Sequence, residues 1–227
     1  MRDTPSKLRV IETAATVVVA IAALGVFAMR YLDRREARAA AVVETYETER
    51  DWRLYDVSGS LLTEGNHRAT LVEFANFGCP ACRASVPVVD SALAESGGEL
   101  ALRFRHLPLR VNPGSRAAAL AAICADEQSR FAEFYRGAWL LSDTLEVVDW
   151  TAFAAVIGVP DTAGFRTCLS SPVALGRLAA DSADGAKLAV RGTPTFLVGD
   201  QRVNGLPRDR TDFLEKIRQH LSRYSNP

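Results

Sequence analysis

The pattern of apolar and polar residues predicts alternating strands and helices along most of the chain. A short apolar run at residues 71–74, with Glu73 inside it, stops at Asn76 and Gly78, and Pro80 then suits the first position of a helix because its φ is already helical. The Ser-Gly-Gly sequence after residue 95 ends this helix, and residues 100–106 alternate as a strand. The centre of the chain therefore reads as strand, turn, helix and strand.

The residues after this unit carry helical periodicity before strand patterns return. Four runs recur at helical spacing, namely 116–126, 131–141, 149–157 and 172–190. Strand character returns at 195–198, a Gly199–Asp200 turn leads into 202–204, and a last amphipathic helix begins at Asp209. This order predicts a mixed α/β fold with a helical insertion at about residues 115–188.

The N-terminal part contains one long apolar run, residues 13–29, between Arg9 and Arg30. A helix of this length spans about 30 Å, the thickness of the hydrocarbon core of a bilayer. A cleaved signal peptide is the alternative, but charged residues follow the run and no small-residue cleavage site lies close to it. We expect an uncleaved transmembrane helix, and because arginines flank both of its ends, they do not set its orientation.

Four parts follow from these patterns: an N-terminal flank at 1–9, a transmembrane anchor at 10–30, a helical stalk at 31–51 and the α/β domain at 52–227. The stalk is rich in Ala, Glu and Arg and has neither Gly nor Pro, which favours a solvated helix. Within the domain, residues 55–63 read as a first short strand.

Composition argues against one class of partner. The chain has 27 basic and 27 acidic residues, and the basic residues are scattered rather than clustered. Nucleic-acid binding depends on a concentrated positive surface. The sequence therefore gives no reason to expect a nucleic-acid partner.

The chemistry of the chain is carried by Cys79-Pro80-Ala81-Cys82, directly after the first strong strand. Cys79 falls at or near the N-terminus of the helix, where unpaired backbone N–H groups and the helix dipole favour a thiolate over a thiol. Cys82 lies three residues on, within reach of Cys79, so the pair can close a small disulfide ring. We therefore expect Cys79 to be a nucleophile and Cys82 its disulfide partner.

Half of a metal site is the alternative interpretation of this pair. It would require further Cys or His ligands at compatible spacing. The remaining cysteines lie far away in the sequence and the three histidines form no cluster; these residues are Cys124, Cys168, His67, His106 and His220. Redox chemistry is therefore predicted, with no metal and no cofactor.

Two motifs carry a family resemblance. Val72-Glu73-Phe74 before the Cys79–Cys82 pair, together with Arg191-Gly192-Thr193-Pro194-Thr195-Phe196, resembles the DsbA-like branch of the thioredoxin fold over about residues 62–221. The resemblance implies that Cys79 attacks and Cys82 resolves. It also implies a cis peptide bond before Pro194, and a substrate-binding surface formed by Thr193, Pro194, Pro80 and Ala81.

The same resemblance gives Glu73 a role, because similar proteins place a buried acid at this position. A desolvated carboxyl has a raised pKa and can exchange a proton with Cys82. An exposed carboxylate is the alternative. Ala81 departs from the strongly oxidising relatives, which have a histidine there, and its side chain cannot stabilise the Cys79 thiolate by hydrogen bond or charge. We therefore expect a milder oxidant or a reductant.

Cys124 and Cys168 form the second pair of cysteines, and both lie in the predicted helical insertion. In an exported protein, two cysteines left over after the Cys79–Cys82 pair predict a structural disulfide. The resemblance supports this disulfide, because related proteins often have a pair of cysteines in similar places. Two unpaired buried cysteines are the alternative.

These observations predict a thiol:disulfide oxidoreductase on the periplasmic side of a bacterial cytoplasmic membrane, held there by a single-pass helix. Its substrates would be exported proteins with thiols or disulfides. A membrane redox partner, either a quinone-linked oxidase or an electron carrier, would recycle the cysteine pair. Two alternatives stay open: a dedicated reductant for cytochrome or metal-site cysteines, and a non-catalytic module that binds a metal or a peptide.

Overall fold

The computed structural model describes residues 25, 45–63, 65–207 and 209–223. The predicted flank and anchor and most of the predicted stalk lie outside this range, Gly25 excepted. Among the described residues no helix has both the length and the apolar character needed to cross a membrane. The domain that follows residue 43 is one compact unit.

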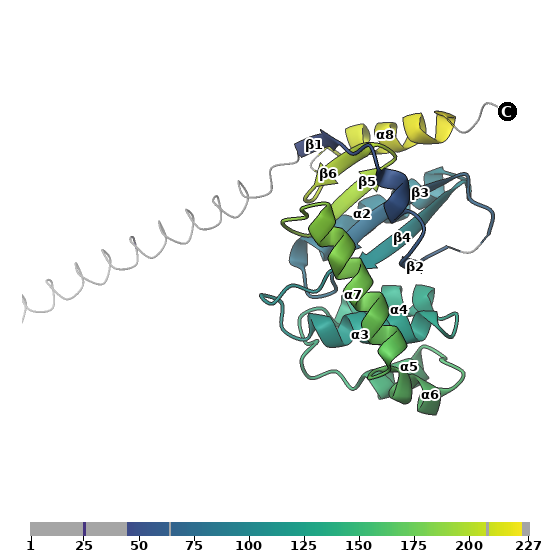
Figure 1. Cartoon of the computed structure of the whole chain (residues 1–227), viewed down its shortest axis with the longest axis vertical. Helices are drawn as coiled ribbons and strands as arrows, with labels where there is room; N and C mark the ends of the chain where they lie inside the picture. Colours follow the sequence, from purple (N-terminus) through teal and green to yellow (C-terminus); the bar gives the residue numbers. More distant parts are fainter. Residues whose placement is uncertain (1–24, 26–44, 64, 208, 224–227) are drawn as a thin grey trace, which may run out of the picture. The chain divides into compact units, whose positions relative to one another are not determined.

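A six-stranded sheet forms the centre of this domain, in the order β1-β6-β5-β3-β4-β2 (Figure 1). The strands are β1 (Thr45–Thr48), β2 (Ser60–Leu61), β3 (Ala69–Ala75), β4 (Leu100–His106), β5 (Thr195–Val198) and β6 (Gln201–Asn204). Strand β3 runs parallel to β4 and antiparallel to β5, and this register sets Glu73 opposite Phe104 on one side and Phe196 on the other. An almost fully buried central strand thus carries the single acid of the motif.

Helices cover both faces of the sheet. They are η1 (Trp52–Tyr55), α2 (Pro80–Glu95), α3 (Ser115–Asp126), α4 (Phe131–Ala138), η2 (Trp139–Leu141), α5 (Trp150–Val156), α6 (Thr162–Cys168), α7 (Pro172–Lys187) and α8 (Arg210–Arg223). Figure 1 shows α3 to α6 gathered at one end of the domain, with α7 leading back to the sheet. The mixed α/β fold with a helical insertion is therefore confirmed.

The main core lies on the sheet face that carries Leu71 and Glu73, where α2, α8 and the helical insertion pack. Phe77, directly after β3, joins the insertion to the sheet. Its ring lies 5.1 Å from that of Phe104 and 4.8 Å from that of Trp139, measured between centroids. Aromatic packing of Phe77 against the sheet and the insertion therefore holds the turn before the cysteine pair in place.

On the opposite face, Arg105 of β4 is fully buried and binds two aspartates of α7. Its Nε lies 2.6 Å from Asp181 Oδ1, its Nη2 lies 2.6 Å from Asp184 Oδ2, and its Nη1 donates to the carbonyl oxygen of Tyr55 at 2.9 Å. Asp181 also accepts the backbone N–H of His106. Because these groups are paired and hydrogen-bonded, the charged network fixes α7 and η1 against β4.

Residues 45–48 correct the prediction of a helical stalk up to residue 51. They form β1, which pairs antiparallel with β6, and Glu49 adds a further backbone hydrogen bond to Asp200. The sequence Thr-Tyr-Glu-Thr has high strand propensity, and β6 offers unpaired backbone groups that a strand satisfies and a helix does not. The strand predicted at 55–63 is also shorter than expected, since only Ser60–Leu61 pairs with β4.

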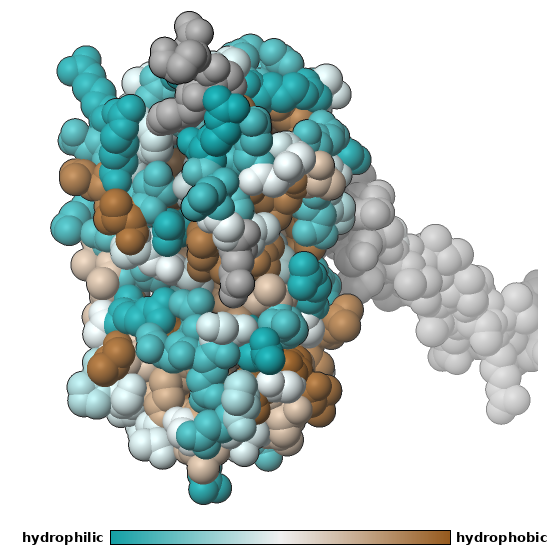
Figure 2. Space-filling model, turned by 90° about the vertical axis from the view of Figure 1, so that its right-hand side faces the viewer, coloured by the Kyte–Doolittle hydropathy of each residue, from teal (hydrophilic) through white to brown (hydrophobic). Residues whose placement is uncertain are grey.

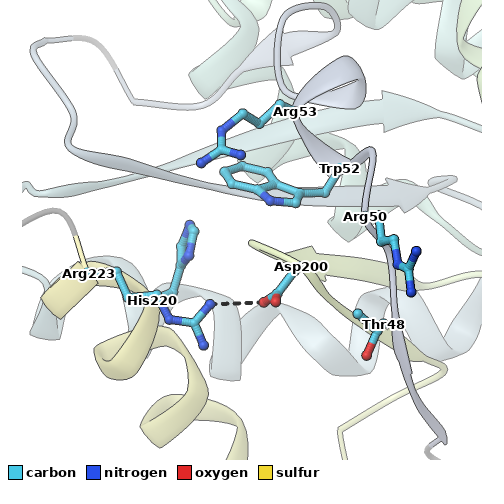
Figure 3. A pocket seen from close by; sticks show the side chains of 7 residues that line it. All are labelled: Thr48, Arg50, Trp52, Arg53, Asp200, His220 and Arg223. Carbon is cyan, nitrogen blue, oxygen red and sulfur yellow. Dashed lines mark hydrogen bonds and ion pairs between the residues drawn. The ribbon is translucent and has the colours of Figure 1, made fainter.

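Beside this edge, Trp52 of η1 packs against the C-terminal helix (Figure 3). Its ring lies edge-on to that of His220 at 5.3 Å, and the Arg53 guanidinium lies 4.8 Å above it. A cavity of about 400 Å³ opens here, with Asp200 and Arg223 joined by a 3.0 Å ion pair in its wall. These contacts close the end of the sheet and involve none of the predicted site residues.

Exposed apolar side chains are dispersed over the surface. Figure 2 shows several hydrophobic patches on one face, with hydrophilic side chains between them. Most of the large exposed examples belong to the loops and helices between β4 and β5: Val111, Leu140, Val147, Val156, Val173 and Leu175.

Candidate active site

A tight turn after β3 places Cys79 at the N-cap of α2. The side-chain oxygen of Asn76 accepts the backbone N–H of Gly78 at 3.1 Å, and the carbonyl oxygen of Asn76 accepts that of Cys79 at 3.1 Å. Cys79 has extended backbone angles and Pro80 takes the first helical position, as the sequence predicts. Asn112 donates a 2.8 Å hydrogen bond to the carbonyl oxygen of Gly78 and fixes the turn from the other side.

Cys79 is a largely buried thiol, 8% exposed, and its environment favours the thiolate. A hydrogen bond from the Cys82 side chain lowers the pKa of Cys79 to about 6, with smaller contributions from Thr193 and from the backbone N–H groups of Ala81 and Cys82. Burial opposes these effects. The helix N-terminus thus supplies donors where a developing negative charge requires them.

Cys82 has the opposite character. Its side chain is fully buried, and desolvation raises its pKa, as do the hydrogen bond to Cys79 and the nearby charge of Glu73. One cysteine of the pair is therefore ready to attack at neutral pH, whereas the other retains its proton. A resolving reaction by Cys82 needs a base.

Glu73 is the candidate for the base that Cys82 needs. It is fully buried between Phe104 and Phe196 of the neighbouring strands, and burial raises its pKa to about 8. The Ser85 hydroxyl lies 3.2 Å from Glu73 Oε1, and this hydrogen bond partly offsets the effect of burial. The alternative of an exposed carboxylate is wrong, because no part of Glu73 reaches the surface.

Thr193 and Pro194 lie beside the cysteines although they are more than a hundred residues away in the sequence. The Thr193–Pro194 peptide bond is cis, and Cys79 Sγ lies 3.2 Å from the carbonyl oxygen of Thr193. Of the other predicted substrate-binding residues, Pro80 is exposed and Ala81 is half-buried. Thr193 thus offers a backbone segment alongside the reactive sulfur.

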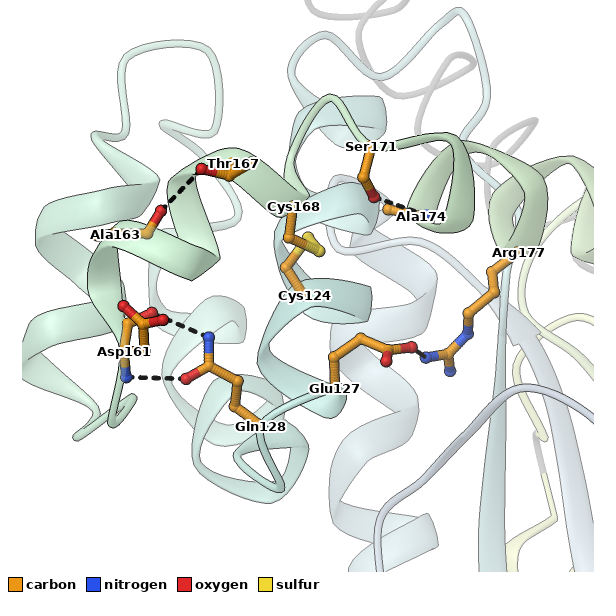
Figure 4. Close-up of a disulfide and its surroundings, with 10 residues drawn as sticks. All are labelled: Cys124, Glu127, Gln128, Asp161, Ala163, Thr167, Cys168, Ser171, Ala174 and Arg177. Carbon is orange, nitrogen blue, oxygen red and sulfur yellow. Dashed lines mark hydrogen bonds and ion pairs between the residues drawn. A yellow bond between two sulfur atoms is a disulfide. The ribbon is translucent and has the colours of Figure 1, made fainter.

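The structure joins Cys124 and Cys168 in a disulfide between α3 and α6, within the helical insertion (Figure 4). It lines a separate cavity together with Glu127, Gln128 and Asp161. Figure 4 also shows Glu127 paired with Arg177 of α7 at 2.6 Å. This pair of cysteines is therefore not part of the group formed by Cys79, Cys82, Glu73 and Thr193.

Three residues to which sequence reasoning assigned no role in the chemistry belong to the site. Asn76, already predicted to end the strand, also shapes the turn, since Asn side chains commonly bond the backbone two residues on. Ser85 contacts Glu73, and its position one helical turn after Cys82 is the available signal. Asn112 reaches Gly78 from a distant loop, which no local pattern indicates.

His106 was not assigned to the site, and its surroundings are structural. It is buried, its Nε2 lies 3.2 Å from the Ser60 hydroxyl, and burial lowers its pKa to about 3. Elsewhere, the described residues contain no group of three or more His, Cys, Asp or Glu side chains arranged to hold a metal ion.

The fold and the asymmetric dithiol together define a thiol:disulfide oxidoreductase of the thioredoxin fold. The chain belongs to the thioredoxin family, whose sequence pattern matches residues 57–217.

Among curated proteins, the chain is similar to the Na(+)/H(+) antiporter NhaA 3 of Salinispora tropica, with 37% identity over 138 residues. A second relative, the Na(+)/H(+) antiporter NhaA 1 of Mycobacterium sp. strain KMS, is 32% identical over 150 residues. These matches cover 60% and 65% of this chain but only 21% and 24% of the relatives. The chain thus spans less than a quarter of their length.

Solved structures share the fold at low sequence identity. Alpha-DsbA2 of Wolbachia pipientis, a thiol-disulfide exchange protein, gives a TM-score of 0.63 at 20% identity, covering 74% of this chain and 90% of its own. A thioredoxin-like oxidoreductase of Silicibacter pomeroyi gives 0.57 at 23%, covering 78% and 91%. A periplasmic thioredoxin-like protein of Salmonella enterica gives 0.55 at 16%, covering 72% and 90%. These likenesses establish the DsbA-like form of the fold.

Proposed function

We propose that this protein exchanges disulfides with exported proteins through Cys79 and Cys82. The observation that carries the proposal is the contrast within the pair: hydrogen bonds lower the pKa of Cys79, whereas burial raises that of Cys82. The Cys79 sulfur is the nucleophile at neutral pH, and Cys82 keeps its proton until a mixed disulfide has formed. Such a division of roles suits exchange better than the equal ligation of a metal.

In the reducing direction, the Cys79 thiolate attacks a substrate disulfide, which forms a mixed disulfide and releases one substrate thiolate. Cys82 then gives its proton to the Glu73 carboxylate and attacks Cys79 Sγ. The mixed disulfide breaks, the second substrate thiolate leaves, and the Cys79–Cys82 disulfide forms. Two electrons pass from the protein to the substrate. In the oxidising direction each step is reversed, and Glu73 returns the proton to Cys82.

Thr193 holds the substrate in this scheme. Its backbone lies beside Cys79 Sγ, so an extended substrate segment can pair with it while its sulfur approaches Cys79 in line with the breaking bond. In this scheme Pro80, Ala81 and Pro194 complete the contact surface.

The proposed location is the periplasmic side of the cytoplasmic membrane, with the apolar run at residues 13–29 as the anchor. A cycling disulfide fits an oxidising compartment. The Salmonella protein with the same fold is described as periplasmic, and the curated relatives are Na(+)/H(+) antiporters. Ion exchange is not part of this proposal, because the matched segment is a small part of those relatives.

A membrane redox partner must recycle the pair, and the reduction potential determines its kind. A full chain equilibrated with graded glutathione buffers gives this value. Thioredoxin has a reduction potential of about −270 mV. A value well above it would assign a quinone-linked oxidase as the partner, and a value near or below it would assign an electron carrier.

The function itself is tested with the full chain and a disulfide-containing peptide. Wild-type protein is expected to exchange with the peptide, Cys79→Ser to be inactive, and Cys82→Ser to accumulate the mixed disulfide. Absence of exchange in the wild-type chain, or equal activity in both variants, would contradict the proposal. A membrane-impermeant maleimide tests the location, because a periplasmic Cys79 reacts in intact cells whereas a cytoplasmic one reacts only after lysis.

A further inference from the structure

The hydroxyl of Ser85 contacts the Glu73 carboxyl and the backbone of Cys82, the two residues that exchange a proton in the proposed reaction. Its Oγ is 3.2 Å from Glu73 Oε1 and 2.7 Å from the backbone carbonyl oxygen of Cys82. Ser85 is fully buried in α2, so water does not compete for these contacts. One small side chain therefore touches both the acid on β3 and the helical turn that carries the resolving cysteine.

Ser85 has only one hydroxyl hydrogen for these two acceptors. When Glu73 is ionised, the hydrogen must point to its carboxylate, because a buried charge without a donor is costly. When Glu73 is protonated, its own O–H can donate to Ser85 Oγ, and the Ser85 hydrogen is then free to donate to the Cys82 carbonyl oxygen. Each charge state of Glu73 thus has its own direction of hydrogen bonding.

The rest of the Glu73 environment offers little else. Phe104 and Phe196 lie opposite it on the neighbouring strands. Its second oxygen, Oε2, has no hydrogen-bond partner among the residues that the structure describes. The titratable groups that act on this site are Cys79 and Cys82 of α2, with Tyr135 contributed by α4; β4 and β5 present apolar rings instead. Ser85 is the hydrogen-bond donor available to the Glu73 carboxylate in this part of the structure.

We propose that Ser85 is a positioning residue for disulfide exchange, and that its hydroxyl turns from the Cys82 carbonyl to Glu73 whenever Glu73 loses its proton. The turn stabilises the carboxylate that accepts the Cys82 proton and keeps it fixed against α2. It leaves the atoms of Ser85 unchanged, since the proton that moves passes between Cys82 and Glu73. This inference rests on the proposed exchange function.

The direct test follows the Glu73 carboxyl carbon by ¹³C NMR through a pH titration of the reduced full chain. Ser85→Ala removes the hydrogen-bond donor to Glu73. The ionised form of Glu73 then loses more stabilisation than the neutral form, because hydrogen bonds to charged groups are stronger. The titration midpoint of Glu73 is expected to rise by about one pH unit. Ser85→Thr retains the hydroxyl and is expected to titrate near the wild-type midpoint.

Ser91→Ala is the matched control. Ser91 lies on the same helix and donates to the carbonyl oxygen of Pro87 at 2.8 Å, but it has no contact with Glu73. An unchanged midpoint in Ser85→Ala, or an equal shift in Ser91→Ala, would overturn the proposal. Because the readout is the carboxyl itself, it remains valid even if the wild-type chain shows no exchange.

The kinetic test measures release of a preformed mixed disulfide at Cys79 near pH 7. Ser85→Ala is expected to slow release by about tenfold, because a rise of one unit in the pKa of Glu73 leaves about one tenth as much of the carboxylate at this pH. Ser85→Thr is expected to restore most of the rate. In a Glu73→Gln background the same change should have no further effect. A tenfold loss that persists in that background would mean that Ser85 acts on the packing of α2 instead, which contradicts the proposal.

Discussion

The side-chain amide of Asn76 donates a 3.1 Å hydrogen bond to the hydroxyl oxygen of Thr193, 117 residues further along the chain. The other end of the same side chain accepts the backbone N–H of Gly78. Asn76 thus joins the turn that sets Cys79 to the residue that lies beside its sulfur. One nearly buried amide fixes the relative position of the two halves of the site.

Replacement of Asn76 by Ala is therefore expected to weaken both stability and exchange. Two hydrogen bonds are lost, at about 0.5–1.5 kcal/mol each. Urea unfolding measures the stability, and the second-order rate with a peptide disulfide measures the exchange. Asn76→Asp retains an acceptor for Gly78, so it should lose less stability, while its charge raises the pKa of Cys79. Equal stability of Asn76→Ala and wild type would refute the role of this link.

The low pKa of Cys79 predicts a specific pH dependence of its reactivity. Alkylation of reduced wild-type protein by iodoacetamide should rise with a midpoint near pH 6, because the thiolate is the reacting species. Cys82→Ala removes the main cause of the shift, and the midpoint should move up by about one pH unit. In concentrated urea the midpoint should return to about 8.5. Identical midpoints in wild type and Cys82→Ala would show that the Cys82 side chain does not cause the shift.

Glu73 gives the domain a pH-dependent stability. Its pKa is about 8 in the folded protein and about 4.3 in an unfolded chain. Between these values the unfolded chain binds fewer protons, so the contribution of Glu73 to stability falls as pH rises, by up to about 1.4 kcal/mol per pH unit. Cys79 has the opposite effect above about pH 6, because its pKa is lowered on folding.

Comparison of Glu73→Gln with wild type isolates the effect of Glu73. The stability of the variant relative to wild type should increase from pH 5 to pH 8 in urea unfolding, since glutamine does not ionise. A difference that stays constant over this range would mean that Glu73 titrates at its ordinary pKa in the folded protein.

The disulfide of the helical insertion should stabilise the domain without taking part in exchange. Cys124 and Cys168 are separated by 44 residues. Closing a loop of this length stabilises the folded state by about 4 kcal/mol in the chain-entropy model. The Cys124→Ala/Cys168→Ala variant should lose about this amount in denaturant unfolding and retain its exchange rate under conditions where it is folded. A loss of exchange in the folded variant would place the insertion disulfide in the reaction.

Local signals in the sequence predicted the elements that position the cysteines. The apolar run of β3, the turn at Asn76, Pro80 at the first helical position and the glycines after Glu95 are adjacent in the chain, and α2 and β4 have the predicted bounds. Strand β1 was missed because its partner β6 lies more than 150 residues away. Its four residues have strand propensity, but so short a run beside an Ala-, Glu- and Arg-rich segment does not indicate a strand unless its distant partner is known.

The same distinction between local signals and contacts of distant residues applies to the candidate active site. The spacing of Cys79 and Cys82 is a local signal, and their different character follows from their place on a helix. The approach of Thr193 to Cys79 depends on the pairing of β3 with β5, and a family resemblance, rather than the pattern of residues, predicted it. The position of Ser85 one helical turn after Cys82 can be read from the sequence, but its contact with Glu73 depends on how α2 packs against β3.

Strand β1 also determines where the domain can be cut. Residues Thr45–Thr48 occupy the outer side of β6 through an antiparallel register. A chain shortened to begin at residue 52 would keep every residue of the candidate active site, yet it would leave β6 as a bare sheet edge. Such edges recruit strands from other molecules. A fragment of that kind is expected to self-associate in solution, so the boundary of an independent domain lies before Thr45.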